Sequence, residues 1–122
     1  MILADTSVWI DYFRRGNAAF GARLDERAIL MHPLILGELM LGGLPDQERL
    51  IPDLRALPAA PVASPDETVL FIGVERLAGR GIGYVDAALL ASARLESGTL
   101  LWTRDRRLAA VAADMLIGYD GG

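Results

Sequence analysis

The segment ILADTSVWIDYF, residues 2–13, contains the two kinds of element from which we expect the fold to be built. Its first three residues are apolar and the run stops at Asp5, which is typical of a short buried strand. Ser7 can cap a helix whose apolar residues continue to Phe13, and Gly16-Asn17 breaks that helix. The segment therefore predicts a strand that leads directly into a helix.

The same alternation continues along the rest of the chain. Further apolar runs predict strands over residues 28–31, 59–63, 99–102 and 115–117. Periodicity, caps, prolines and glycines predict helices over residues 18–26, 33–41, 46–57, 64–77, 84–96 and 104–113. Alternating strands and helices predict an α/β fold with a mostly parallel sheet and helices on its faces. A length of 122 residues fits one domain over residues 1–122.

The composition excludes several kinds of site. Cysteine is absent, which excludes disulfides, thiolate zinc sites and cysteine nucleophiles and is compatible with the cytosol. All 12 basic residues are arginine, so mechanisms that need a Schiff-base lysine or a P-loop lysine are excluded as well. No apolar stretch approaches the roughly 20 residues of a membrane span, and no basic leader stands at the N-terminus. We expect a cytoplasmic protein that makes no contact with a membrane.

The net charge of −4 means that the overall field does not attract nucleic acid. Any contact with RNA or DNA must then come from a local basic patch. Two groups of arginines offer one: Arg104, Arg106 and Arg107 near the last predicted helix, and Arg14 and Arg15 at the end of the first. Arginine suits phosphate because its guanidinium binds in a bidentate manner. The alternative is that these arginines belong to solvated helix faces.

Four acidic residues stand where a parallel sheet places its sites, at the carboxyl ends of the strands. Asp5 follows the first strand directly, and Asp105 follows the strand over 99–102. Asp86 lies in the first turn of its helix, and Glu38 lies within the helix after the second strand, so both can face the same rim. Each has a simpler alternative role as a helix cap, a helix-dipole partner or a surface residue.

Clustered carboxylates repel one another unless a cation joins them. Ligands that are all oxygen favour Mg²⁺ or Mn²⁺ over zinc. The chain has a single histidine, His32, and no cysteine, so a zinc site is not expected. His32 precedes Pro33 at a strand end, where an ordinary loop histidine or a contact with substrate is expected. The acidic residues therefore predict a Mg²⁺ or Mn²⁺ site.

Four motifs, in this order, resemble those of PIN-domain proteins, specifically the VapC toxins of bacterial toxin–antitoxin pairs. The motifs are ILADTSVWID at 2–11, LGEL at 36–39 followed by Gly42, YVDAAL at 84–89 with Ala91, and LWTRDRRL at 101–108. Together they cover nearly the whole chain. One position departs from the pattern, because Arg107 stands where many relatives have a further aspartate. That departure leaves the number of metal ions open.

The resemblance implies a three-layer α/β/α sandwich with a central parallel sheet. It implies cleavage of RNA that depends on Mg²⁺ or Mn²⁺, a homodimer, and inhibition by a VapB-type antitoxin encoded alongside. It carries over Asp5, Glu38, Asp86 and Asp105 as the acidic site, with hydroxyl support from Thr6, Ser7 and Thr103.

Other acidic α/β proteins fit the residues less well. Response-regulator receiver domains and haloacid-dehalogenase phosphatases both need a lysine, which this chain lacks. Ala4 precedes Asp5 where a receiver domain has a further acid, and Ser7 stands where the phosphatases have a second aspartate. Two alternatives stay open: a non-catalytic PIN-like binding module and a metal-dependent DNA nuclease.

Overall fold

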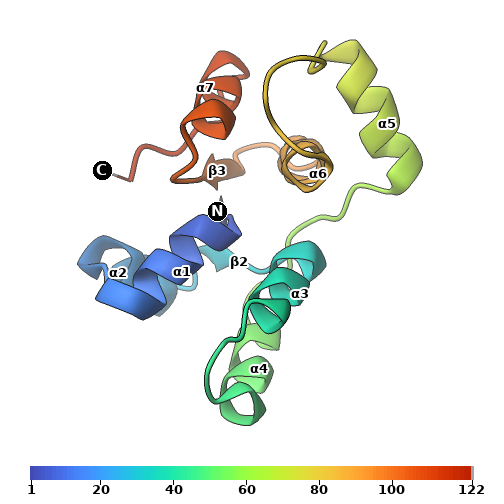
Figure 1. The fold of residues 1–122 in the computed structure, drawn as a ribbon. Coiled ribbons are helices and arrows are strands. Elements are labelled where there is room, and N and C mark those ends of the chain that lie inside the picture. The colour runs from blue at the N-terminus through green and yellow to red at the C-terminus, as the bar shows by residue number, and fades with distance from the viewer. Residues whose placement is uncertain (122) are drawn as a thin grey trace.

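The computed structural model describes residues 1–121 and contains a three-stranded parallel sheet (Figure 1). The strands are β1 Ile2–Ala4, β2 Ile29–Leu30 and β3 Leu100–Trp102, in the order β2-β1-β3. The central strand β1 is buried along its whole length. A parallel sheet that is covered on both faces requires such continuous apolar strands, so the predicted parallel sheet is confirmed.

Seven helices surround the sheet in residues 1–121. They are α1 Thr6–Arg15, α2 Ala18–Asp25, α3 Pro33–Leu41, α4 Gln47–Arg55, α5 Pro65–Val74, α6 Tyr84–Arg94 and α7 Arg106–Asp114. Helices α1 and α2 lie on one side of the strands, and α6 and α7 lie on the other (Figure 1). This is the α/β/α sandwich that was predicted. No helix in the described part of the chain is long and apolar enough to cross a membrane.

Short polar side chains set where several helices begin. Asn17 caps α2 by accepting a hydrogen bond from the amide of Phe20 at 3.0 Å. Ser64 and Glu67 form the predicted capping box at the start of α5. The cap of α1 differs from the prediction: Asp5, and not Ser7, is the capping residue. The first helix therefore begins directly at the end of β1.

Two predicted strands do not form in the structure, and only one of them keeps a single bridge. The segment 59–63 contributes only the pairing of Ala59 with Met31, because the partner chain enters α3 at Pro33, which has no N–H to donate to the next carbonyl of the ladder, that of Ala60. The segment 115–117 is not a strand, because Leu116 adopts a left-handed backbone conformation with φ of 61°. The pairing with β3 begins only after this turn, at Gly118 opposite Leu101.

An aromatic cluster fastens α1 and α2 to the sheet. The rings of Trp9 and Phe20 meet edge to face with centroids 4.8 Å apart, and Phe20 lies 5.6 Å from Trp102 of β3. Trp9 and Phe20 are both completely buried. Aromatic pairs of this kind add about 0.5–1.5 kcal/mol beyond the area they bury. The cluster therefore fixes the junction of β1 and α1 against the end of β3.

His32 is a structural residue and not a loop or substrate-contact histidine, since it is only 1% exposed. Its Nδ1 accepts a hydrogen bond from the amide of Leu34 and caps α3, so its Nε2 carries the proton and donates to the hydroxyl of Ser92 at 3.0 Å. That hydroxyl also accepts from the amide of Ala63. The ring therefore joins α3, α6 and the segment before α5. Burial lowers the pKa of His32.

Replacing His32 by asparagine is expected to lower the free energy of unfolding by about 1–3 kcal/mol, because the bond to Ser92 is lost. The loss is expected to shrink at acid pH. The pKa of His32 is lowered on folding, so below its unfolded value of about 6.5 the unfolded chain binds more protons than the folded one, and the wild type loses stability as pH falls. Urea unfolding of both proteins at about pH 5 and about pH 8 measures this. A difference that is equal at both pH values would contradict the assignment.

Candidate active site

The register of the sheet brings the ends of β1 and β3 together. Ala4 pairs with Trp102, and the amide of Asp5 donates to the carbonyl of Trp102 at 2.9 Å. The next residue of each strand, Asp5 on one side and Thr103 on the other, therefore projects from the same rim of the sheet. This is the carboxyl end of the strands, where open α/β sheets form their sites.

Asp5 uses its two carboxylate oxygens for different purposes. Oδ1 accepts from the amides of Ser7 at 3.0 Å and Val8 at 3.3 Å, which caps α1, and it also accepts from the Ser7 hydroxyl. Oδ2 accepts from the Thr103 hydroxyl. Burial raises the pKa of Asp5, and the hydrogen bonds from Ser7 and Thr103 oppose that effect. Capping α1 and belonging to the acidic site are therefore not alternative roles for Asp5, since the hydrogen bonds of the cap hold this carboxylate at the rim.

Thr103 connects Asp5 to a second acid. Its Oγ1 donates to Asp5 and accepts from the amide of Asp105 at 3.0 Å. Asp105 in turn caps α7, with Oδ1 accepting from the amide of Leu108 at 2.9 Å. A single hydroxyl thus sets the spacing between the acids that follow β1 and β3.

Glu38 and Asp86 reach the rim from α3 and α6. The hydroxyl of Thr6 donates to Glu38 Oε1 at 2.7 Å, which places this exposed glutamate beside the start of α1. The amide of Gly83 donates to Asp86 Oδ2 at 3.1 Å. Burial raises the pKa of Asp86, and the charges of Asp105 and Glu38 raise it further. Asp86 therefore lies close enough to Asp105 and to Glu38 for their charges to act on it.

The four acids lie along one rim but do not surround a common point. Within residues 1–121, no three acidic or histidine side chains form a group that could hold a metal ion as they stand. Mg²⁺ commonly keeps several waters and takes only one or two protein carboxylates, so a cage is not required. Glu38, Asp86 and Asp105 each keep one carboxylate oxygen that accepts no hydrogen bond from any residue the structure describes. Oxygen-only donors that repel one another fit a hydrated Mg²⁺ or Mn²⁺, and not zinc.

Arg104 and Arg15 share one acidic partner, Asp11 of α1. Arg15 bonds to Asp11, and Arg104 Nη1 lies 3.4 Å from Asp11 Oδ2. The amide of Arg104 also donates to the Ser7 hydroxyl at 3.0 Å. Asp11 was not among the acids predicted to matter at this rim, although its i,i+4 spacing to Arg15 is a signal for such an ion pair.

The other predicted arginines lie at separate places around the site. Arg14 and Glu38 both line a cavity of about 210 Å³ between α1 and the end of α3. Arg106 is exposed at the first position of α7. Arg107 lies across Gly81, where an added Cβ would stand only 2.6 Å from its Cδ. The arginines therefore border the acidic rim from several elements and do not form one basic stripe.

Comparison with known proteins gives similarities to a family model, to curated proteins and to a solved structure. Residues 2–114 match the family model of the PIN domain. Two proteins named Ribonuclease VapC32, from Mycobacterium tuberculosis strains CDC 1551 / Oshkosh and ATCC 25618 / H37Rv, are each 43% identical to this chain over 114 residues, covering 93% of this chain and 92% of the relative. The crystal structure of PAE2754 from Pyrobaculum aerophilum covers 90% of this chain and 78% of its own, with a TM-score of 0.55 and 20% identity. That structural likeness bears on the fold alone.

Proposed function

The chain belongs to the PIN-domain family, among the VapC ribonucleases, and from this premise we propose that it is a Mg²⁺- or Mn²⁺-dependent endoribonuclease and the toxin of a VapB–VapC pair. The observation that carries the proposal is the hydroxyl of Thr103, which joins Asp5 and Asp105 at the ends of neighbouring strands. The charge coupling of Asp86 to Asp105 and Glu38 extends the site to four acids.

The proposed mechanism divides the work among these residues. Asp5 and Asp105 would hold the metal ion, and Glu38 and Asp86 would assist them. When bound, the ion makes hydroxide available near neutral pH and offsets charge on the phosphodiester. Ser7, Val8 and Thr103 keep Asp5 in one orientation. In-line attack by water on phosphorus breaks the bond to the 3′ oxygen, which takes up a proton, so the products carry 3′-hydroxyl and 5′-phosphate ends.

The proposal is tested by incubating the purified protein with single-stranded RNA and with DNA of the same sequence, each in Mg²⁺ or Mn²⁺. We expect cleavage of the RNA and products with 5′-phosphate and 3′-hydroxyl ends. Equal cleavage of the DNA would favour a DNA nuclease. Cyclic 2′,3′-phosphate ends would show that the ribose hydroxyl, and not water, is the nucleophile. Binding of RNA without cleavage would favour a non-catalytic module.

Thr103→Val is expected to lower kcat/KM for RNA cleavage about 10- to 100-fold, the usual effect of removing a group that orients a metal ligand. Valine keeps the shape of threonine but loses the bonds to Asp5 and to the amide of Asp105. Thr103→Ser keeps the hydroxyl and is expected to restore most of the activity. Initial rates and melting curves of the three proteins measure this. A valine variant as active as the serine variant would exclude a positioning role.

Arg106→Ala is expected to weaken RNA binding and to reduce the slope of log affinity against log salt concentration by about 1, because one phosphate contact is lost. Arg106 is exposed at the start of α7, directly after Asp105. Arg49→Ala on α4 serves as the matched control, since Arg49 is also exposed and pairs only with its neighbour Asp46 among the residues described. Binding is measured over a potassium titration. An unchanged slope for Arg106→Ala would remove Arg106 from the RNA contact.

The proposed partners are a second copy of the chain and a VapB-type antitoxin. Helix α5 leaves Val69, Leu70 and Val74 between 63% and 69% exposed, which is apolar surface that a partner can cover. Light scattering of the purified protein, alone and after addition of the antitoxin, measures both associations. A protein that stays monomeric at every concentration would contradict the proposed homodimer.

A further inference from the structure

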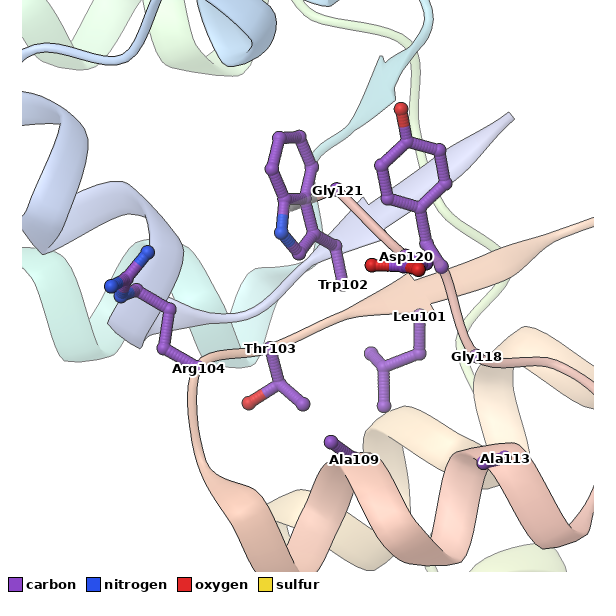
Figure 2. Close-up of a pocket in the computed structure, with 10 residues that line it drawn as sticks. Leu101, Trp102, Thr103, Arg104, Ala109, Ala113, Gly118, Asp120 and Gly121 are labelled. Carbon is purple, nitrogen blue, oxygen red and sulfur yellow. The ribbon is translucent and has the colours of Figure 1, made fainter.

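The face of α1 that meets the segment after β3 carries two arginines joined by one carboxylate. Arg15 Nε donates to Asp11 Oδ1 at 2.8 Å, and Arg104 Nη1 lies 3.4 Å from Asp11 Oδ2. Figure 2 shows the Arg104 side chain extending toward α1. Each oxygen of Asp11 therefore serves a different arginine. These three residues are called the Asp11 cluster below.

The same face of α1 fixes the backbone of Arg104 beside the acidic rim. The amide of Arg104 donates to the Ser7 hydroxyl at 3.0 Å, and that hydroxyl donates to Asp5. Ser7, Asp11 and Arg15 follow one another at intervals of four residues, so they share one face of the helix. Asp11 lies one helical turn beyond Ser7, about 6 Å along the axis. The Asp11 cluster is therefore held next to the acidic site without being part of it.

The cations of the Asp11 cluster face the solvent more than its carboxylate does. The side chain of Asp11 is 12% exposed, against 69% for Arg15 and 46% for Arg104. The hydrogen bond from Arg15 and the charge of Arg104 lower the pKa of Asp11, so this carboxylate stays charged. Two guanidinium groups outnumber one carboxylate, and each keeps N–H donors that Asp11 does not use. The cluster therefore presents positive charge and hydrogen-bond donors to an anion.

The stability of the fold does not account for this arrangement, because ion pairs at exposed positions contribute little to it. The arrangement does affect how the two arginines can bind. A long side chain that is already held by a carboxylate loses less freedom when it binds a ligand. Guanidinium groups match phosphate oxygens in charge and in geometry. Phosphate is therefore the anion that the cluster suits.

We propose that Asp11 positions Arg104 and Arg15 to bind a phosphate of the RNA strand next to the phosphodiester that is cleaved. The proposal rests on the ribonuclease function proposed above. The protein has a net charge of −4 and an acidic site, so the strand on either side of the cleaved bond needs local positive charge to stay bound. The Asp11 cluster supplies that charge at a fixed place. Asp11 acts through the two arginines, so it is a positioning residue and not a catalytic one.

Asp11→Asn separates positioning from the effect of charge alone. If Asp11 were only a negative charge near the strand, its removal would tighten RNA binding. We expect the opposite: affinity for a labelled single-stranded RNA, measured by fluorescence anisotropy in a chelator so that no cleavage occurs, falls about 5- to 10-fold. In cleavage assays, KM is expected to rise by a similar factor while kcat stays nearly unchanged, because the contact is made equally before and during the reaction.

Two further variants control this measurement. Asp46→Asn makes the same change in charge and also removes an exposed pair, that of Asp46 with Arg49, so it is the matched control and is expected to bind RNA as the wild type does. Asp11→Glu keeps the negative charge and is expected to retain most of the affinity. Melting curves of the same samples detect any loss of folding.

Arg104→Gln tests the same contact from its other side, and it leaves the amide of residue 104 free to bond to Ser7. It is expected to weaken binding about 10-fold and to reduce the slope of log affinity against log salt concentration by about 1. Adding Asp11→Asn to Arg104→Gln is expected to cause a much smaller further loss than Asp11→Asn causes alone, because the two changes remove the same contact.

Several results would overturn the phosphate site alone in a protein that cleaves RNA. They are tighter or unchanged binding by Asp11→Asn, and full additivity of Asp11→Asn and Arg104→Gln. If Asp11→Asn does not fold, wild-type affinity and salt slope in Arg104→Gln would overturn it as well. Absence of RNA cleavage by the wild type in Mn²⁺ would instead overturn the proposed function.

Discussion

Replacing Asp5 by asparagine is expected to lower RNA cleavage about 1000-fold while leaving the protein folded. The loss exceeds the roughly 10- to 100-fold cost of removing an outer partner of a metal site, because the substitution removes the charge of a proposed metal ligand itself. Asparagine caps helices as well as aspartate does, and its oxygen can still accept from the amides of Ser7 and Val8. The effect on activity is therefore expected to be separate from any effect on stability.

Initial rates of RNA cleavage and thermal melting of the same samples measure this separation. Asp53→Asn is the matched control, because it makes the same chemical change at an exposed position of α4, away from the rim. We expect the control to cleave RNA at the wild-type rate. Full metal-dependent cleavage by Asp5→Asn would exclude Asp5 from the site. Unfolding of Asp5→Asn would show instead that the cap of α1 dominates its role.

Removal of divalent ions is expected to reduce cleavage to background, and addition of Mg²⁺ or Mn²⁺ is expected to restore it. Without a cation, Asp105 and Glu38 each repel the carboxylate of Asp86, and all of these carboxylates repel the phosphate of the substrate. A bound ion offsets both effects and supplies the activated water. Zinc is expected to restore much less activity, because the site offers oxygen ligands only.

The measurement compares the cleavage rate after dialysis against a chelator with the rate after each ion is added back. Melting curves in the same buffers control for unfolding, and a bound ion is expected to raise the melting temperature of the wild type. Asp105→Asn is expected to reduce that increase. Cleavage that persists at full rate in the chelator would contradict a metal-dependent mechanism.

The general fold was predictable because local patterns and the fold agree at the start of the chain. An apolar run that ends at Asp5 and leads into a helix is typical of a strand that begins an α/β unit, and β1 and α1 confirm this prediction. The strands expected over 59–63 and 115–117 were wrong. The partner of the first segment leaves the sheet at Pro33, where α3 begins, and the second segment contains Leu116 in a left-handed conformation. Apolar runs alone do not show such interruptions.

The geometry of the acidic rim depends on contacts that no sequence pattern contains. The sequence placed Asp5 and Asp105 after strands, but only the pairing of Ala4 with Trp102 makes those strands neighbours. The positions of Glu38 and Asp86 beside the rim depend on how α3 and α6 pack. The number of residues between the acids in the sequence does not determine that packing. From the sequence, capping of a helix and membership of the acidic site were alternative roles for Asp5. In the structure, one carboxylate oxygen of Asp5 caps α1 and the other accepts a hydrogen bond from Thr103.

The arrangement of the arginines is a second feature that the sequence did not reveal. Three arginines close together near Asp105 suggested one basic patch, but Arg104 turns to Asp11 while Arg107 lies across Gly81. Consecutive residues at the start of a helix point in different directions, so arginines that are close in the sequence do not form one basic surface. The proposed contact with RNA therefore rests on individual arginines around the rim.

The most direct test of the acidic site is the anomalous X-ray signal of Mn²⁺ in crystals of the wild-type protein grown or soaked with that ion. We expect a manganese peak coordinated by a carboxylate oxygen of Asp5 or Asp105, and a strongly reduced peak in Asp5→Asn. Manganese bound elsewhere, or no peak at this rim in a protein that cleaves RNA with Mn²⁺, would contradict this expectation.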